Sequence, residues 1–133
     1  MIDTSIWIDV YEDRKGFNGE PLGEYGLKLL SDILARKDKI IISEILIDEL
    51  SGRYSLSHIL GMLKPFEDII EKIIPTEEEK KIAKKISIER ELPLGDALHA
   101  IIARDNNAIL ITRDKHFRKL EDISSHYRPE EII

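Results

Sequence analysis

The stretch Ala108-Ile109-Leu110-Ile111-Thr112 is an apolar run without polar alternation, and Lys39-Ile40-Ile41-Ile42-Ser43 is a second one. Such runs are typical of strands buried on both faces of a parallel sheet. Three further strands are expected: a very short one at Met1-Ile2, one from Glu71 to Pro75, and an edge strand from Tyr127 to Ile133, in which Pro129 is tolerated.

Helical patterns separate these strands. Thr76 with Glu79 three residues later predicts a capping box that opens a helix ending near Arg90. Arg14 to Tyr25, with three glycines and a proline, is expected to be a loop. The alternation predicts an α/β fold, a three-layer α/β/α sandwich around a central parallel sheet. The other expected helices carry apolar stripes at 6–11, 27–34, 45–50 and 56–66, ending near Lys64-Pro65, and at 97–103.

Composition narrows the function classes. The 133 residues fit one domain, residues 1–133, and the apolar fraction of 42% with 35% charged residues is typical of a globular protein. No apolar run approaches a membrane span and no export signal is visible, so we expect a cytoplasmic protein. The absence of cysteine excludes thiol catalysis and Cys-based zinc sites. The net charge of −6 predicts that any contact with nucleic acid is local and uses bridging cations.

Four acidic residues fall where parallel sheets bind ligands, beyond the carboxyl ends of the strands. Asp3 ends the first strand, Glu49 lies in the helix after the second, Asp96 opens a helix after Pro93-Leu94-Gly95, and Asp114 follows the strand 108–112. Each alone has a structural explanation. Asp3 and Asp96 could be helix N-caps, Glu49 a solvated helix residue, and Asp114 a turn residue. Together at one edge they would repel one another, and oxygen ligands of this kind suit Mg²⁺ or Mn²⁺.

These four positions lie in stretches that resemble PIN domains of the VapC toxin type. The resemblance rests on Asp3-Thr4-Ser5-Ile6-Trp7-Ile8, on Ile42-Ser43 with Asp48-Glu49-Leu50 and Gly52, on Pro93-Leu94-Gly95-Asp96-Ala97-Leu98-His99-Ala100, and on Leu110-Ile111-Thr112-Arg113-Asp114-Lys115-His116-Phe117. The motifs come in the family order and extend over residues 1 to 120. One departure is the first strand, which is shorter than in many relatives.

The resemblance implies a metal-dependent endoribonuclease that cleaves RNA, often the toxin of a toxin–antitoxin pair. Asp3, Glu49, Asp96 and Asp114 would be the catalytic residues and hold Mg²⁺ or Mn²⁺. Thr112 and Ser5, with Thr4 as an alternative, would orient a carboxylate or a water. Arg113 and Lys115 could hold RNA phosphates, or simply be solvated. The implied partners are a small antitoxin and a second copy of the chain in a homodimer.

Two other functions remain open, an RNA-processing nuclease without an antitoxin and a PIN-like interaction module without catalysis. The four intact acids argue against the second. A phosphatase of the haloacid dehalogenase kind is rejected, because it needs a second Asp where this chain has Ser5. We expect His99 to pack in the helix body, His116 to be a turn residue, and Trp7 to lie in the core or in a subunit contact.

Overall fold

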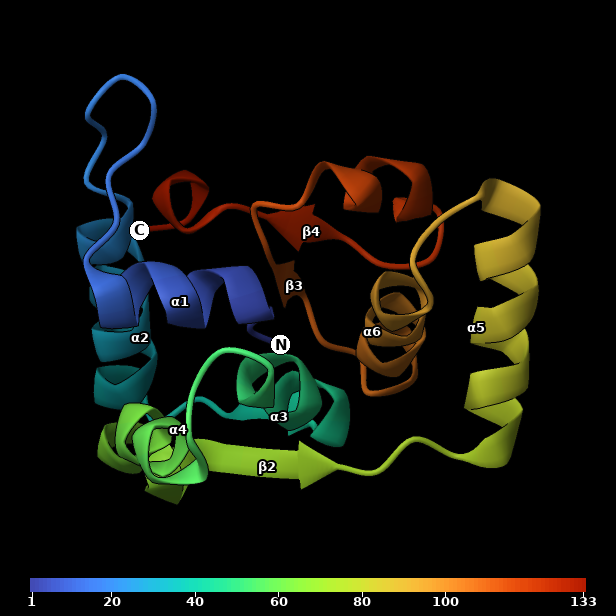
Figure 1. Cartoon of the computed structure of the whole chain (residues 1–133), viewed down its shortest axis with the longest axis horizontal. Coiled ribbons are helices and arrows are strands. Elements are labelled where there is room, and N and C mark those ends of the chain that lie inside the picture. Colours follow the sequence, from blue (N-terminus) through green and yellow to red (C-terminus); the bar gives the residue numbers. More distant parts are fainter.

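The computed structural model describes all 133 residues as helices around short parallel strands, which form two separate two-stranded sheets (Figure 1). No helix combines the length and apolar character that crossing a bilayer requires. The main elements are α1 (Thr4–Glu12), α2 (Leu22–Arg36), β1 (Ile40–Ser43), α3 (Glu44–Ser51), α4 (Leu56–Leu63), β2 (Ile70–Ile73), α5 (Glu77–Arg90), α6 (Leu94–Asp105), β3 (Leu110–Ile111) and β4 (His126–Tyr127). Three 3₁₀ helices add η1 (Lys64–Ile69), η2 (Lys115–Leu120) and η3 (Pro129–Glu131).

All strand pairs are parallel, which confirms the predicted α/β class. β1 pairs with β2 in the register Ile40 to Ile70, and β3 pairs with β4. The N-terminal residues extend the second pair, because Ile2 bridges Ile111 in parallel and Asp3 N–H donates to the Ile111 carbonyl at 2.9 Å. The carboxyl ends of the N-terminal segment and of β3 therefore meet at Asp3 and Thr112.

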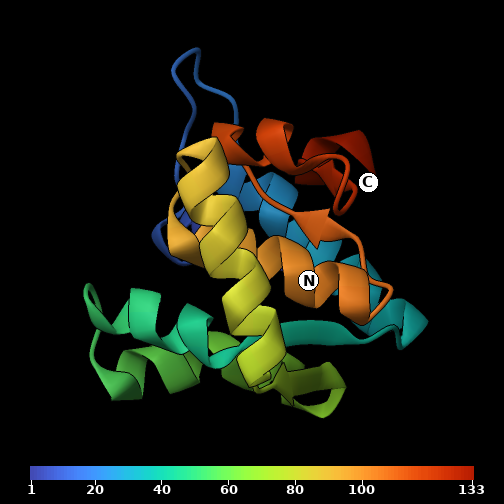
Figure 2. The same cartoon turned by 90° about the vertical axis from the view of Figure 1, so that its right-hand side faces the viewer.

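Side chains alternate across the strands and build two cores on opposite faces. Ile2, Ile42 and Ile111 pack with helices α1 to α4 in one core. Met1 and Leu110 pack with α5 and α6 in the other, where helix α6 is buried over most of its length. Figure 2, turned by 90°, shows α5 in front of α6 on this second face. This arrangement is the expected three-layer sandwich.

Several boundaries differ from the sequence prediction. The last strand covers only His126–Tyr127, because Pro129 lacks an N–H and begins η3 instead. The loop after α1 ends at Pro21 rather than Tyr25, since α2 already begins at Leu22. Residues 56–66 divide into α4 and η1, which begins at Lys64-Pro65. The capping box of Thr76 and Glu79 is present as predicted, with hydrogen bonds of 3.1 and 2.9 Å.

Candidate metal centre

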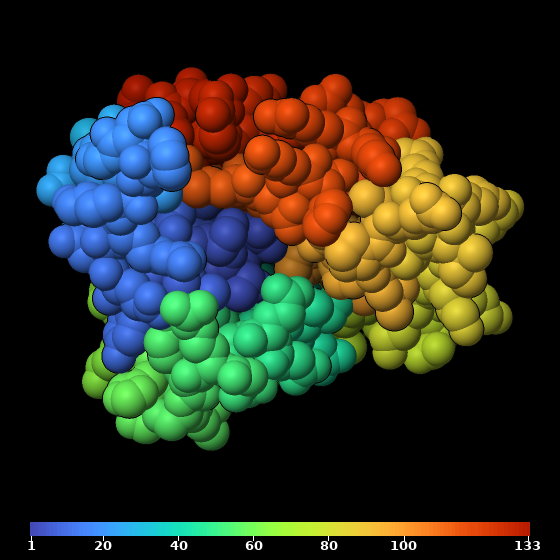
Figure 3. Space-filling model, turned by 45° about the horizontal axis from the view of Figure 1, so that its top comes forward, coloured from blue at the N-terminus to red at the C-terminus, as the bar shows by residue number.

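The four predicted acids converge on one edge of the sheet, although they are up to 111 residues apart in the chain. Asp3 precedes α1, Glu49 lies in α3, Asp96 in the first turn of α6, and Asp114 precedes η2. In the space-filling view of Figure 3 the N-terminal residues, in dark blue, reach the surface between the segments that carry the other three acids.

Asp3 is buried and surrounded by donors. Its Oδ2 accepts hydrogen bonds from Thr112 Oγ1 at 2.8 Å and from Ser5 Oγ at 3.0 Å. Although Asp3 precedes α1, its side chain accepts no capping hydrogen bond from the helix backbone, so the N-cap explanation does not account for it. Burial alone would raise the pKa of Asp3, but the contacts with His99, Thr112 and Ser5 lower it below its usual value. The fold therefore holds this carboxyl group in its ionised form.

Glu49 is brought to the site by two neighbours. Thr4 Oγ1 donates to Glu49 Oε2 at 2.7 Å and fixes the carboxylate near the start of α1. Gly95 allows the start of α6 to approach, because a Cβ at this position would lie only 3.2 Å from Glu49 Oε1. The side chain of Glu49 remains 39% exposed, so its carboxylate faces both the site and the solvent.

Asp96 and Asp114 form the outer part of the site with His116. The ligand atoms of these three residues all lie within 4.8 Å of one another. Burial, followed by the charges of Asp114 and Asp3, raises the pKa of Asp96 to about 6. Asp96 makes no capping hydrogen bond in α6, whose N-cap is Pro93. Asp114 does act as a cap, because its Oδ1 accepts from His116 N–H at 2.9 Å.

Two hydroxyl groups connect the inner and outer acids. Thr112 Oγ1 donates to Asp3 and accepts from the backbone N–H of Asp114 at 3.0 Å. Ser5 Oγ donates to Asp3 and accepts a hydrogen bond from the Arg113 backbone N–H at 3.4 Å. The structure thus places Thr112 and Ser5 against the acids, where we expected them, and gives Thr4 a separate contact with Glu49.

Two histidines outside the predicted set also lie in the site. His99 is 1% exposed, with Nδ1 3.4 Å from Asp3 Oδ1 and Nε2 3.9 Å from Glu49 Oε1, and neither nitrogen makes a geometrically good hydrogen bond. Burial would lower the pKa of His99, but the neighbouring Asp3, Glu49 and Asp96 raise it. It packs in the helix as expected, and in addition it separates two acids.

His116 is more than a turn residue. Its Nδ1 lies 2.9 Å from Asp96 Oδ2 and 3.0 Å from Asp114 Oδ1. The charge of Asp114 is the main cause that raises the pKa of His116. The sequence signals were the i, i+3 spacing of Asp96 and His99 on one helix face and the Asp114-Lys115-His116 turn, which folds the ring back toward the acids.

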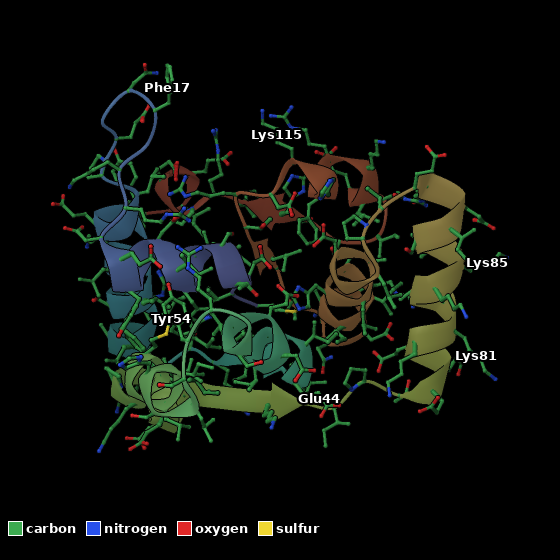
Figure 4. The ribbon with its side chains drawn as sticks, viewed as in Figure 1. Phe17, Glu44, Tyr54, Lys81, Lys85 and Lys115 are labelled. Carbon is green, nitrogen blue, oxygen red and sulfur yellow. The ribbon has the colours of Figure 1, made fainter.

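The basic residues next to Asp114 have different surroundings. The partly buried guanidinium of Arg113 is already paired, because Nε donates to Asp9 and Nη1 to Glu130, both at 2.8 Å. Two carboxylates thus already pair with this guanidinium, whose role toward RNA phosphates stays a prediction. Lys115 is exposed and projects from the edge of the molecule (Figure 4). Trp7 is buried in the core, 6.0 Å from Phe66.

The chain is similar to known proteins in family and in fold. A family model described as PIN domain matches residues 1–123. Among solved structures, the chain resembles one in the crystal structure of VapBC2 from Rickettsia felis bound to a DNA fragment from their promoter. The TM-score is 0.68 at 20% identity, over 96% of both chains, and this likeness concerns the fold. Comparison with curated proteins gives no match. The family match over most of the chain shows that this protein belongs to the PIN domain family.

Proposed function

We propose that this protein is a Mg²⁺- or Mn²⁺-dependent endoribonuclease that hydrolyses phosphodiester bonds in RNA. PIN domains are generally nucleases, and PIN nucleases generally use divalent metals. The observation that carries the proposal is the convergence of Asp3, Asp96 and Asp114, with Glu49 beside them, at one edge of the sheet.

The donor set fits a divalent cation. Asp96 is largely buried and its pKa is raised by two neighbouring carboxylates, so its ionised form lacks compensating charge. The imidazole of His116 already stands between Asp96 and Asp114, at 2.9 and 3.0 Å, where a positive charge is favoured. Carboxylate oxygens are the ligands that Mg²⁺ and Mn²⁺ prefer. Asp3, Asp96 and Asp114 would hold the ion, with Glu49 at the exposed side.

The chemistry that such an ion supplies is Lewis-acid polarisation of the scissile phosphodiester. The chain's own residues orient its ligands. Thr112 keeps one oxygen of Asp3 engaged, and the same hydroxyl fixes the backbone at Asp114. Thr4 fixes Glu49. Site residues that are held in this way need little reorganisation when substrate binds.

We propose further that the protein is the cytoplasmic toxin of a VapBC-type pair, with a small antitoxin as partner and a homodimer as its own assembly. The likeness in fold to a chain of the VapBC2 structure supports this assignment over an RNA-processing nuclease without an antitoxin. A neighbouring reading frame that encodes a small DNA-binding protein, which co-purifies with this chain and suppresses cleavage, would agree with it.

Cleavage of a mixed single-stranded RNA pool tests the nuclease proposal. Wild-type protein should cut with Mn²⁺ and stop with EDTA, and Asp96→Asn should slow cleavage by at least about a hundredfold. Asp105→Asn is the matched control, because Asp105 ends the same helix and pairs with Arg104 at the surface. A folded Asp96→Asn protein that cuts as fast as the control would remove Asp96 from the site. Wild-type protein that cuts no RNA with Mn²⁺ would favour the non-catalytic module.

A further inference from the structure

A fully polar pocket adjoins the acidic site. It has a volume of about 460 Å³, and no hydrophobic residue lines it. Thr112 and Asp114 belong to its wall as well as to the acidic site. Its other walls come from η2 and from the segment around β4, so it lies beyond the carboxyl ends of β3 and β4. Whatever occupies this pocket therefore lies next to a group bound at the acids.

Lys115 and Arg118 present two free positive charges to this pocket. Both belong to the 3₁₀ helix η2, in which residues three apart project on the same side. Phe117 and Leu120, also three apart, are buried and anchor the other side of η2 in the core. Neither Lys115 nor Arg118 has a carboxylate oxygen within 4.0 Å, although the chain carries a net charge of −6.

The remaining arginines of the wall are already paired. Arg128 Nε lies 2.9 Å from Glu131 Oε1, and Arg113 is held by Asp9 and Glu130. The free positive charge of the pocket is therefore concentrated on Lys115 and Arg118, while Asp114 and Glu121 contribute carboxylates to the same wall. Two unpaired cations on one face repel each other unless an anion lies between them. An ammonium and a guanidinium together offer several donors to the oxygens of a phosphate.

We propose that this pocket binds a backbone phosphate of the RNA strand, adjacent to the phosphate cleaved at the acids, through Lys115 and Arg118. The inference rests on the proposed nuclease function and deepens it. Contacts of this kind do not read bases, so they fix the position of the strand on the enzyme rather than its sequence. They also explain how an acidic protein can bind a polyanion, because the attraction is confined to one wall of the site.

Binding without cleavage tests the pocket directly. Fluorescence anisotropy in EDTA, with a labelled unstructured oligouridylate, measures affinity as a function of salt concentration. Lys115→Gln/Arg118→Gln should bind roughly tenfold more weakly at 0.1 M salt and lose about 0.7 from the slope of log affinity against log salt, the contribution of one single-strand phosphate. Each single substitution should lose about half of that slope. All these substitutions are at exposed positions, and circular dichroism checks that the variants fold.

Lys81→Gln/Lys84→Gln is the matched control. These lysines are also three apart, exposed and without a carboxylate within 4.0 Å, but they lie on α5 (Figure 4, where Lys81 is labelled at the lower right and Lys115 at the top). The control should bind RNA as wild type does. Equal affinity and equal salt slope in the Lys115/Arg118 variants would contradict the proposal that this pocket binds a phosphate. Cleavage by wild-type protein with Mn²⁺ would in that case still support the proposed nuclease function. Selective loss of affinity supports the pocket even if wild-type protein does not cleave.

Discussion

Asp3 and Asp96 are neighbouring carboxylates of one site, and the fold shifts their pKa values in opposite directions. Asp3 is the more deeply buried, yet two hydroxyl donors and a histidine lower its pKa. Asp96 retains more exposure, yet its pKa rises to about 6, because burial and the charges of Asp114 and Asp3 outweigh the contact with His116. The depth of burial therefore does not decide which acid is ionised. The number of donors that contact each carboxylate decides it.

The difference divides the site into an inner part and an outer part. At the inner part, Asp3, the chain compensates the negative charge; at the outer part, Asp96 and Asp114, it does so only incompletely. The chain itself compensates the charge of Asp3, so this residue forms a fixed anchor on the sheet. The outer acids, Asp96 and Asp114, share only the exposed ring of His116 between them. A divalent cation would supply the missing positive charge at the outer part, and its removal should affect the two acids differently.

The largest expected effect is the loss of the inner charge. Asp3→Asn should lower the free energy of unfolding of the metal-free protein by about 3 kcal/mol, because two hydroxyls and the buried ring of His99 lose a charged neighbour. Urea unfolding in EDTA at pH 7.5 measures this. Asp105→Asn should change the stability by less than about 0.5 kcal/mol. An Asp3→Asn protein as stable as that control would mean that the inner part is not compensated as described.

Metal addition should act on the outer part. At a hundredfold excess over the dissociation constant, Mn²⁺ should add about 2.7 kcal/mol to the free energy of unfolding at pH 7.5. The gain should shrink at pH 5, because protons compete for the oxygens of Asp96. Thermal midpoints with Mn²⁺ and with EDTA, at both pH values, measure the gain. Asp96→Asn should lose most of it, and an unchanged midpoint in wild-type protein would contradict the metal site.

Without metal, the charge of Asp96 should destabilise the fold. The folded-state pKa lies above the unfolded one, so the folded protein binds more protons between pH 4 and pH 6, and stability falls as the pH rises through this window. Asp96→Asn removes this penalty. The variant should be about 2 kcal/mol more stable than wild type at pH 7.5, and the difference should vanish near pH 4. Urea titrations in EDTA at several pH values show whether the two curves converge; parallel curves would contradict the pKa assignment.

The sequence could predict the position of the acids but not the contacts of Arg113 and His116. The apolar runs ending at Ser43 and Thr112 placed the strands, and strand ends share one edge in a parallel sheet, so the four acids could be brought together from the sequence alone. The pairing of Arg113 could not be predicted. Its partners Asp9 and Glu130 lie 104 and 17 residues away, and no local pattern marks them. His116 was missed because its contacts depend on the turn that Asp114 caps.

The hydroxyl of Thr112 gives the smallest and most local test, because it is the link between the two parts of the site. It donates to Asp3 and accepts from the N–H of Asp114, and the residue is 1% exposed. Thr112→Val keeps the shape but removes both hydrogen bonds, which should lower the free energy of unfolding by about 1 to 2 kcal/mol. Thr112→Ser keeps the hydroxyl and should retain most of that stability apart from the cost of one buried methyl. With Asp3 less compensated, the valine variant should also bind Mn²⁺ more weakly than the serine variant, as measured by the thermal shift. Equal stability and equal metal response in the two variants would show that the inner and outer acids are held independently of this hydroxyl.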